Sequence, residues 1–285
     1  MNYHCQKLKS GLYLVATPLG SARDITLRAL DVLCSCDALA AEDTRSMRKL
    51  LNIHNIPLKD RPILSYNDFN GDRVRPTIMN WLNSNMAVAY ASDAGMPLIA
   101  DPGYQLSKQA AEAGFYVTAV PGASACITAL SLSGLPTDRF FFEGFLPVSK
   151  EKRRQKLKEL ASIPSTLIFY ESPKRLIKMF EDLIAIMGEN RRVVIARELT
   201  KKFEQIISGT LGELHALILK KPLKGELVVL LDRPLTTGLQ DLDVKAELRI
   251  ALSEMTLKDA SDFVASAHGL SKRYVYNLAL SMREN

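Results

Sequence analysis

Short apolar runs alternate with amphipathic stretches along residues 1–135, and this alternation constrains the fold more than any other feature. The apolar runs have the length of strands and lie at 12–17, 37–42, 62–66, 86–92 and 116–120. The stretches with helical periodicity follow them at 26–36, 44–53, 74–85, 104–114 and 123–134. Strands that are joined through helices run parallel, and the helices cover both faces of their sheet. The pattern therefore predicts an α/β domain over residues 1–135.

A second α/β domain is predicted over residues 136–235. The stretch PTDRFFFEGFLPVSK at 136–150 breaks the alternation, because it is aromatic, holds two prolines and leads into a basic helix. Further strands are predicted at 165–172, 191–198, 202–209 and 225–232, and further helices at 173–188 and 211–220. Since two of these strands follow each other without an intervening helix, we expect a mixed sheet.

The last segment, residues 236–285, carries no strand pattern. Three helices are predicted at 243–255, 256–269 and 271–282. Thr256 and Ser271 are the expected N-caps, and Gly269 is an expected C-cap. A helix, a glycine turn and a helix that starts SKRYVY are similar to a helix-turn-helix. Two interpretations stay open for this helical module, a contact with RNA and a packing tail, because positive charge is not concentrated in it.

Composition narrows the class of protein. The chain has 285 residues, of which 47% are hydrophobic, and this suits two domains with sizeable cores. The net charge of +6 is compatible with a polyanionic partner, although many metabolic enzymes are as basic. No apolar run approaches the length of a membrane span, and the first residues lack the apolar stretch of a signal peptide. We therefore expect a soluble, cytoplasmic protein without membrane contact.

The cysteines and histidines do not form a metal-binding pattern. Cys5, Cys34, Cys36 and Cys126 include no C-x-x-C pair, and the histidines are scattered along the chain. Structural zinc sites need clustered ligands, so we predict no metal. Thiols without a framework spacing in a cytoplasmic protein are expected to fill core positions.

Loops rich in glycine, proline and aspartate follow the predicted strands of the first domain. The longest is SDAGMPLIADPG, which begins at Ser92. Gly95 and Gly103 permit positive φ and a close approach of the backbone to a ligand, while Asp93 can accept hydrogen bonds from hydroxyl or ammonium groups. Another loop, VPGASA at 120–125, leads into a helix whose N-terminal amides point outward. A single loop of this kind is an ordinary turn, but several at the carboxyl edge of one parallel sheet indicate a ligand site.

The fingerprints of several common enzymes are missing from the sequence. The first strand is not followed by G-x-G-x-x-G, and the chain has no G-x-x-x-x-G-K-[ST] and no G-x-S-x-G. Nicotinamide-dependent enzymes, P-loop nucleotidases and α/β-hydrolases are thereby disfavoured.

A set of motifs gives the chain a family resemblance. They are LYLVATPLG…DITLRAL, AAEDTR, SDAGMPLIADPG, VPGASA, FYESPKR, ARELTKKFEQ and KGELVVL. In this order they resemble the tetrapyrrole-methylase superfamily, and within it the members that methylate small-subunit ribosomal RNA. Each motif alone is weak, whereas the set covers nearly the whole chain. GSARD at 20–24 departs from the family's usual Gly-Asn-Leu/Ile, and SYNDFN at 65–70 departs from an often His-containing segment.

The resemblance implies a two-domain α/β enzyme that holds S-adenosylmethionine in the cleft between its domains and releases S-adenosylhomocysteine. It implies 2′-O-methylation of a cytidine ribose in the decoding region of 16S rRNA, within the small ribosomal subunit. It further implies a homodimer and a C-terminal helical module. Carried over motif by motif, the implied cofactor-binding residues are Pro18, Asp93, Gly95, Met96, Ser124, Ala125, Tyr170, Gly225 and Glu226. For Tyr170, a core position for the ring is the alternative.

Candidate catalytic residues lie in AAEDTR, at the carboxyl end of the second strand. A ribose hydroxyl is a poor nucleophile while it is protonated, so a nearby carboxylate would assist methyl transfer. We hypothesise that Glu42 or Asp43 takes the proton or orients the ribose, and that Arg45 holds a phosphate through two hydrogen bonds. The alternative is that these residues cap the helix that begins near Thr44.

A track of positive charge is predicted for RNA phosphates. The helix SKEKRRQKLKEL at 149–160 has six positive charges against two acids, although a solvated face is its usual role. The track is expected to include Arg153, Arg154, Arg191, Arg192, Lys201 and Lys202. Phosphate contacts weaken with salt, so charge reversal at Arg153 and Arg154 is expected to weaken RNA binding and to flatten its salt dependence.

Two alternative functions remain open besides RNA methylation. One is a small-molecule methylase of the same superfamily that acts on a tetrapyrrole, although such a substrate requires neither the basic helix nor the helical module. The other is a ribosome-binding factor without catalytic turnover, which the intact cofactor loops argue against.

Overall fold

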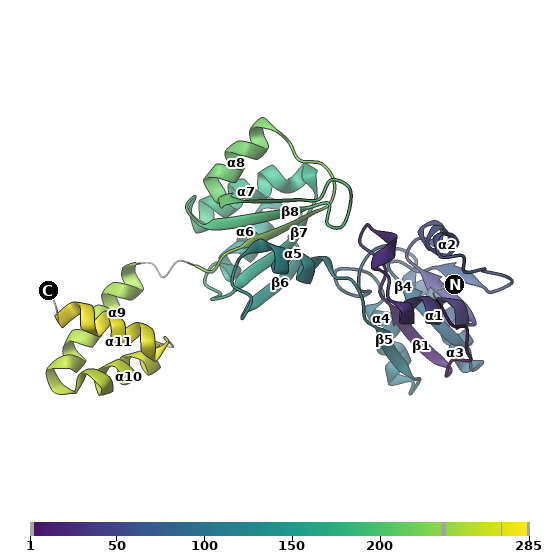
Figure 1. Ribbon diagram of the computed structural model, residues 1–285, viewed down its shortest axis with the longest axis horizontal. Helices are drawn as coiled ribbons and strands as arrows, with labels where there is room; N and C mark the ends of the chain where they lie inside the picture. Colours follow the sequence, from purple (N-terminus) through teal and green to yellow (C-terminus); the bar gives the residue numbers. More distant parts are fainter. Residues whose placement is uncertain (1–2, 235–237, 269, 284–285) are drawn as a thin grey trace. The chain divides into compact units, whose positions relative to one another are not determined.

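The computed structural model describes residues 3–234, 238–268 and 270–283 (Figure 1). The chain divides into two compact units, Met1–Arg233 and Pro234–Asn285. The first unit holds two sheets with their helices, and the described residues of the second unit form helices alone. None of the described helices has both the length and the apolar character that crossing a membrane requires.

The first sheet is parallel throughout, as the sequence predicts. Its strands are β1 (Gly11–Val15), β2 (Ala38–Ala41), β3 (Ile63–Ser65), β4 (Ala87–Ala91) and β5 (Val117–Val120). They lie in the order β3-β2-β4-β1-β5, and every adjacent pair is parallel. The helices that connect them are α1 (Leu27–Ser35), α2 (Thr44–Ile53), α3 (Gly71–Asn83) and α4 (Tyr104–Glu112). A short 3-10 helix, Ala22–Asp24, precedes α1.

Both faces of this sheet are covered, which explains why its strands are apolar without alternation. Tyr13 and Val15 of β1 pack into a core with α1 and α2. Leu12 and Leu14 point to the opposite face and pack into a core with α3 and α4. All residues of β1, β2 and β4 are buried as a result. The strands therefore end in loops at one edge of the sheet, where ligands bind in parallel α/β folds.

The second sheet is mixed, which confirms the prediction. Its strands are β6 (Phe140–Phe145), β7 (Thr166–Glu171), β8 (Arg192–Arg197), β9 (Gln205–Thr210) and β10 (Leu227–Leu231), in the order β6-β7-β10-β8-β9. β6 pairs with β7 in parallel, and the other pairs are antiparallel. One face packs against α6 (Lys150–Leu160), α7 (Pro173–Met187) and α8 (Leu211–Lys220).

The opposite face of the second sheet is covered by α5 (Ala125–Ser133). Cys126, Ala129 and Leu130 of α5 share a core with residues of β7, β8 and β10. The predicted first domain, residues 1–135, includes this helix, whereas its buried side packs on the second sheet. Strand β6 was not predicted, because FFFEGF lacks the alternation of a strand. In the structure, the pairing of β6 with β7 shifts its register between Phe142 and Gly144.

The second unit is a three-helix module in its described residues. Its helices are α9 (Gly238–Glu254), α10 (Leu257–His268) and α11 (Lys272–Arg283). Val244, Leu248, Val264 and Val275 are buried in their common core. The predicted caps are confirmed at Thr256 and Ser271, whose hydroxyls accept hydrogen bonds from the backbone N–H groups of Asp259 and Tyr274. Gly269, the predicted C-cap, lies outside the described residues. The predicted boundary between the second domain and the helical module, at 235/236, lies outside them as well.

The cysteines differ in part from the prediction. Cys36 and Cys126 are buried free thiols, as expected. Cys5 and Cys34 instead form a disulfide, which ties the N-terminal segment to α1, so their predicted role as core fillers is wrong. The spacing of 29 residues gives no sequence signal for this pair, because the contact depends on how the N-terminal segment folds back.

Candidate functional site

A cavity of about 390 Å³ opens where loops of the first sheet meet strand ends of the second. The first sheet contributes the loop after β2, the loop after β4 and the loop before α5. The second sheet contributes the ends of β6 and β7 and the start of β10. We call this space the donor cavity. Its wall includes Leu19, Glu42, Asp93, Gly95, Met96, Ile99, Asp101, Ser124, Ala125, Phe145, Tyr170, Glu171, Leu199, Gly225 and Glu226.

The loop after β4 is fixed against the loop after β1. Gly95 and Thr17 exchange two backbone hydrogen bonds, of 2.9 and 3.0 Å, in an isolated antiparallel bridge. The Thr17 hydroxyl also donates to the Ser92 carbonyl at 3.1 Å. Gly95 has φ +83°, a conformation that strongly favours glycine, as predicted. The backbone at the tip of β4 is therefore held in one position beside the cavity.

The wall from the second sheet is built around Tyr170. Its ring packs edge-on against Phe142 and Phe145, with centroid distances of 4.9 and 5.7 Å. Its hydroxyl accepts a hydrogen bond of 3.1 Å from the backbone N–H of Cys126 in α5. Burial raises the pKa of Tyr170 to about 12, so the phenol stays neutral. Tyr170 is thus both part of the core and part of the cavity wall.

The loop that carries Gly225 and Glu226 is held by Glu198. The Glu198 carboxylate accepts from the Glu226 backbone N–H at 2.9 Å, and the Glu198 N–H donates to the Glu226 carbonyl at 3.0 Å. Lys201 pairs with both carboxylates, at 3.2 Å from Glu198 and 3.0 Å from Glu226. Glu198 lies in the motif ARELTKK, and its role is to position the neighbouring KGE turn.

The donor cavity is acidic. Carboxylates of Glu42, Asp93, Asp101, Glu171 and Glu226 line it, and none of the described lining residues is lysine, arginine or histidine. Burial is the main cause of a raised pKa in Glu42, Asp93 and Glu171, and it raises the pKa of Asp101 to about 6. Neighbouring carboxylates, Glu42 first, contribute to this rise in the pKa of Asp101. An acidic, partly desolvated wall favours a cationic ligand and disfavours one that presents phosphates.

Most of the predicted site residues meet in this cavity. Eight predicted cofactor residues line it: Asp93, Gly95, Met96, Ser124, Ala125, Tyr170, Gly225 and Glu226. Pro18 lies instead in an adjacent cavity of about 230 Å³, which shares Leu19 and Asp93 with the donor cavity.

The three predicted catalytic residues are separated by the structure. Glu42 lines the donor cavity, and its carboxylate accepts from the Asp93 N–H at 3.2 Å. Asp43 is the N-cap of α2 and accepts from the Arg45 N–H at 2.8 Å, which is the alternative role that the sequence left open. The Arg45 side chain is 90% exposed and pairs with Asp43 at 2.6 Å, outside the cavity wall.

Two acidic residues of the cavity wall were not singled out from the sequence. Asp101 lies two residues before the end of SDAGMPLIADPG, and Glu171 follows Tyr170 in FYES. Both lie in motifs that the sequence analysis used, but a motif does not tell which of its side chains point inward.

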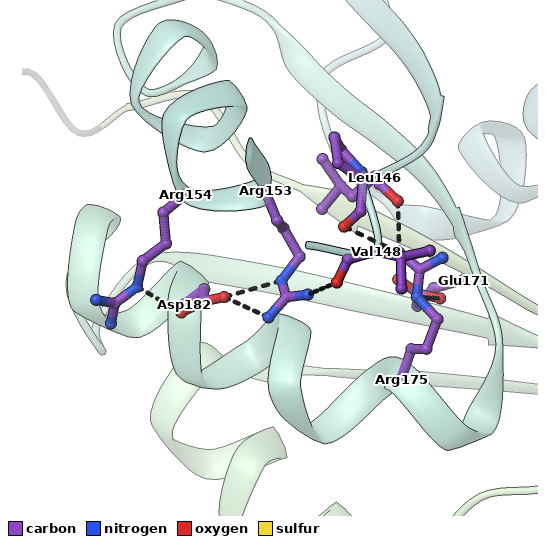
Figure 2. Close-up of polar contacts among 8 residues, drawn as sticks. Leu146, Val148, Arg153, Arg154, Glu171, Arg175 and Asp182 are labelled. Carbon is purple, nitrogen blue, oxygen red and sulfur yellow. Dashed lines mark hydrogen bonds and ion pairs between the residues drawn. The ribbon is translucent and has the colours of Figure 1, made fainter. Parts of the chain in front are cut away.

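The predicted track of positive charge is wrong at two of its residues, Arg153 and Arg191, which are buried. Figure 2 shows that Arg153 and Arg154 both pair with Asp182 of α7, at 2.7 and 2.6 Å. The Arg153 side chain is 6% exposed, and Arg191 is also buried, with its guanidinium bonded to the carbonyls of Asp232 and Ala161. Arg153 and Arg191 hold the second domain together and cannot reach RNA phosphates, whereas the Arg154 side chain is partly exposed. Charge reversal at Arg153 is therefore expected to destabilise the fold, so it does not test RNA binding.

Comparisons with known proteins agree with the fold. The family described as Tetrapyrrole (Corrin/Porphyrin) Methylases matches residues 11–215, and the RsmI C-terminal HTH domain matches residues 239–283. Ribosomal RNA small subunit methyltransferase I of Vibrio cholerae is 45% identical over 94% of both chains, and that of Escherichia coli O157:H7 is 43% identical over 95% of both. A solved uroporphyrin-III C-methyl transferase from Thermus thermophilus, complexed with S-adenyl homocysteine, superposes with a TM-score of 0.57 over 78% of this chain and 97% of that one, at 17% identity, and so supports the fold alone.

The chain therefore belongs to the tetrapyrrole methylase family, a class of α/β methyltransferases with two sheets. Within that family it belongs to the group of ribosomal RNA small subunit methyltransferase I. This membership confirms the predicted fold class, methyltransferase activity, and S-adenosylmethionine as the methyl donor.

Proposed function

We propose that this protein transfers the methyl group of S-adenosylmethionine to the 2′-hydroxyl of a cytidine in the decoding region of 16S rRNA. The similarity to ribosomal RNA small subunit methyltransferase I extends over nearly the whole chain, including the C-terminal module. The observation that carries the proposal is the acidic donor cavity between the loops of the two sheets. We further propose that the protein acts as a homodimer in the cytoplasm on the small ribosomal subunit.

The donor cavity fits S-adenosylmethionine by its chemistry. The donor carries two cationic groups, a sulfonium and an ammonium, and it has no phosphate. The carboxylates of Asp93 and Glu42 suit these cations, while Met96, Ala125 and Leu199 offer apolar contact for the adenosine. We assign Asp93, Gly95, Met96, Ser124 and Ala125 to the methionine and ribose portions. Tyr170, Gly225 and Glu226 are assigned to the adenine side, and Pro18 borders the site from the adjacent cavity.

The main catalytic contribution of the residues of this chain is to align the two reactants. A sulfonium methyl group is already activated, so the enzyme must hold the acceptor oxygen in line with it. Fixing two reactants in this way supplies about 7–11 kcal/mol of barrier reduction. Of the residues proposed from AAEDTR, Glu42 lies on the cavity wall and is assigned to orient the ribose. Asp43 and Arg45 stay in the proposal as groups outside the wall of the donor cavity, where Asp43 lines the adjacent cavity and the exposed Arg45 would hold a phosphate.

Glu42→Gln is expected to slow methyl transfer by about 100-fold in single-turnover assays, because misplacing the ribose by about 1 Å costs a factor of this size. Asp43→Asn is the matched variant on the next residue, and it is expected to slow transfer only slightly, since Asp43 caps α2. Quench-flow measurement with labelled donor and small ribosomal subunits gives both rates. Wild-type rates in both variants would contradict any catalytic role for this motif.

RNA binding is assigned to cations that remain exposed. On α6 these are Lys150, Lys152 and Lys158, and in the second domain Arg192 of β8 and Lys202 of the turn before β9 are exposed as well. The helical module at 239–283 is the second proposed RNA contact. Phosphate contacts from these groups would make binding weaken steeply with salt.

The proposed function is tested by mapping ribose methylation on small-subunit rRNA from cells with and without this protein. Loss of a single 2′-O-methylcytidine in the decoding region is the expected result. A methyl-transfer assay with a tetrapyrrole precursor in place of small subunits tests the alternative of a small-molecule methylase. Calorimetric titration with S-adenosylmethionine distinguishes an active enzyme from a binding factor that has lost its donor site.

A further inference from the structure

A second, smaller pocket lies beside the donor cavity. It has a volume of about 130 Å³ and is formed by the loop after β3, the start of α3 and the start of α4. We call it the side pocket. Among the described residues, Asp101 is the one that lines both this pocket and the donor cavity. The Asp101 carboxylate therefore lies at the boundary between the two pockets, within reach of a ligand in either one.

The side pocket offers contacts that suit a pyrimidine nucleoside. Tyr104 lines it with a ring that is 61% exposed, and unstacked RNA bases pack on such rings. The carboxylate of Asp68, which also lines it, can accept a hydrogen bond from the exocyclic amine of cytosine. Arg75 of the same wall is held by an ion pair with Asp72. The pocket thus combines an aromatic platform with a hydrogen-bond acceptor for an amine.

The position of Asp101 is fixed by its neighbours. The buried Tyr90 hydroxyl donates to the carbonyl of Pro102 at 2.7 Å, directly after Asp101. Before it, Ala100 adopts φ +60°, and Leu98 adopts φ +72°. Such strained positions in residues other than glycine persist where the surrounding structure holds them, often at functional sites. The backbone on both sides of Asp101 is therefore held in place.

Several groups face Asp101 from the surrounding elements. They are Glu42 after β2, Asp68 after β3, Tyr90 of β4, Ser92 and Asp93 after β4, and Tyr170 of β7. Burial, and then the charge of Glu42, raises the pKa of Asp101 to about 6. A carboxylate with such a pKa is ionised near neutral pH and yet more basic than an ordinary aspartate, which suits a proton acceptor.

We propose that the side pocket receives the acceptor nucleoside and that Asp101 accepts the proton of its 2′-hydroxyl; this inference rests on the proposed function. In the reaction, the bond between the ribose oxygen and the methyl carbon forms while the bond between sulfur and that carbon breaks. The electron pair of the broken bond goes to sulfur, which becomes the neutral thioether of S-adenosylhomocysteine. The hydroxyl proton goes to the Asp101 carboxylate and is released to water after the product leaves. Glu42, which lines the donor cavity, orients the ribose.

The test is a pH profile of single-turnover methyl transfer to small ribosomal subunits that lack the modification. The wild-type rate is expected to rise with pH through about 6, because the ionised Asp101 is the active form. Asp101→Asn is expected to lose about 100-fold in rate, and to lose the rise, while binding of S-adenosylmethionine by calorimetry stays within about twofold. Glu42→Gln is expected to lower the whole profile and to shift the rise to lower pH, since a negative neighbour of Asp101 is removed.

Glu112→Gln, on the exposed end of α4, is the control and is expected to keep the wild-type profile. Tyr104→Ala tests the pocket itself, with KM for the subunit raised about tenfold, kcat little changed, and Tyr104→Phe restoring KM. A wild-type rate and profile in Asp101→Asn, or loss of donor binding together with rate, would overturn the role of Asp101. An unchanged KM in Tyr104→Ala would overturn the subsite. If wild-type protein itself transfers no methyl group to the subunits, the proposed function fails instead.

Discussion

Replacing Asp182 with alanine is expected to lower the free energy of unfolding by about 3–5 kcal/mol, because it strands buried positive charge. The Asp182 side chain is 2% exposed and accepts from Arg153 through both Nε and Nη2, at 2.8 and 2.7 Å. Arg153 has one further acceptor, the Val148 carbonyl at 3.1 Å (Figure 2). Without Asp182, the buried guanidinium keeps a single hydrogen bond, to the Val148 carbonyl, and loses its ion-pair partner. Urea denaturation followed by circular dichroism measures the loss.

Two further variants separate the buried pair from its exposed neighbour. Arg154 is 43% exposed and bonds the other carboxylate oxygen, so Arg154→Ala is expected to cost about 1 kcal/mol or less. The double variant Arg153→Met, Asp182→Leu removes both buried charges and is expected to recover most of the lost stability. A cost for Asp182→Ala no larger than that of Arg154→Ala would contradict a stabilising role for the buried pair.

On the basic helix α6, the number of positive charges did not predict which of them are exposed. Arg153, Leu157 and Leu160 are spaced by four and three residues, and all three are buried on one face of α6. That spacing already places Arg153 on the apolar face of the helix. On α7, Asp182 is likewise buried beside Leu183. A lone charge on the apolar face of each of two helices could have predicted the ion pair, whereas the total charge of 149–160 predicted a surface for RNA.

The order of elements was predictable because strand and helix patterns are local. The parallel first sheet and the mixed second sheet follow from runs that periodicity reveals. The packing of α5 on the second sheet was not predictable in this way, since an apolar helix does not specify which sheet it covers. The edge strand β6 was missed because three consecutive phenylalanines show no alternation.

The site was predictable to the level of loops. Motifs at strand ends predicted that Asp93, Gly95, Tyr170 and Gly225 line one cavity. For Asp93 and Gly95 this follows from the parallel topology of the first sheet, whereas Tyr170 and Gly225 belong to the mixed second sheet. The direction of each side chain depends on loop conformation, which the sequence does not display. Asp43 therefore became a helix cap, and Asp101 emerged as the acid between two pockets only through the fold of its loop.

The same loop gives the second large effect, which concerns Gly103. This residue has φ +119°, and a Cβ placed on it would lie 2.4 Å from the ring of Tyr90 and 3.1 Å from Leu98. Gly103→Ala is therefore expected to combine backbone strain with overpacking and to cost about 2–6 kcal/mol of stability. The Tyr90 ring cannot retreat easily, because it is fully buried and packs edge-on against Tyr66 at 5.6 Å.

The matched control is Gly114→Ala, which introduces the backbone strain of a positive φ without a steric contact of the new Cβ. Gly114 has φ +78° but nothing within 4 Å of its virtual Cβ, so its replacement is expected to cost about 1–2 kcal/mol. Thermal and urea unfolding of both variants give the difference. Because Gly103 ends the loop that carries Asp93 and Asp101, Gly103→Ala is also expected to weaken binding of S-adenosylmethionine, whereas Gly114→Ala leaves it unchanged. Equal costs for the two variants would show that the contact with Tyr90 relaxes freely, and that the loop is not held as tightly as its packing indicates.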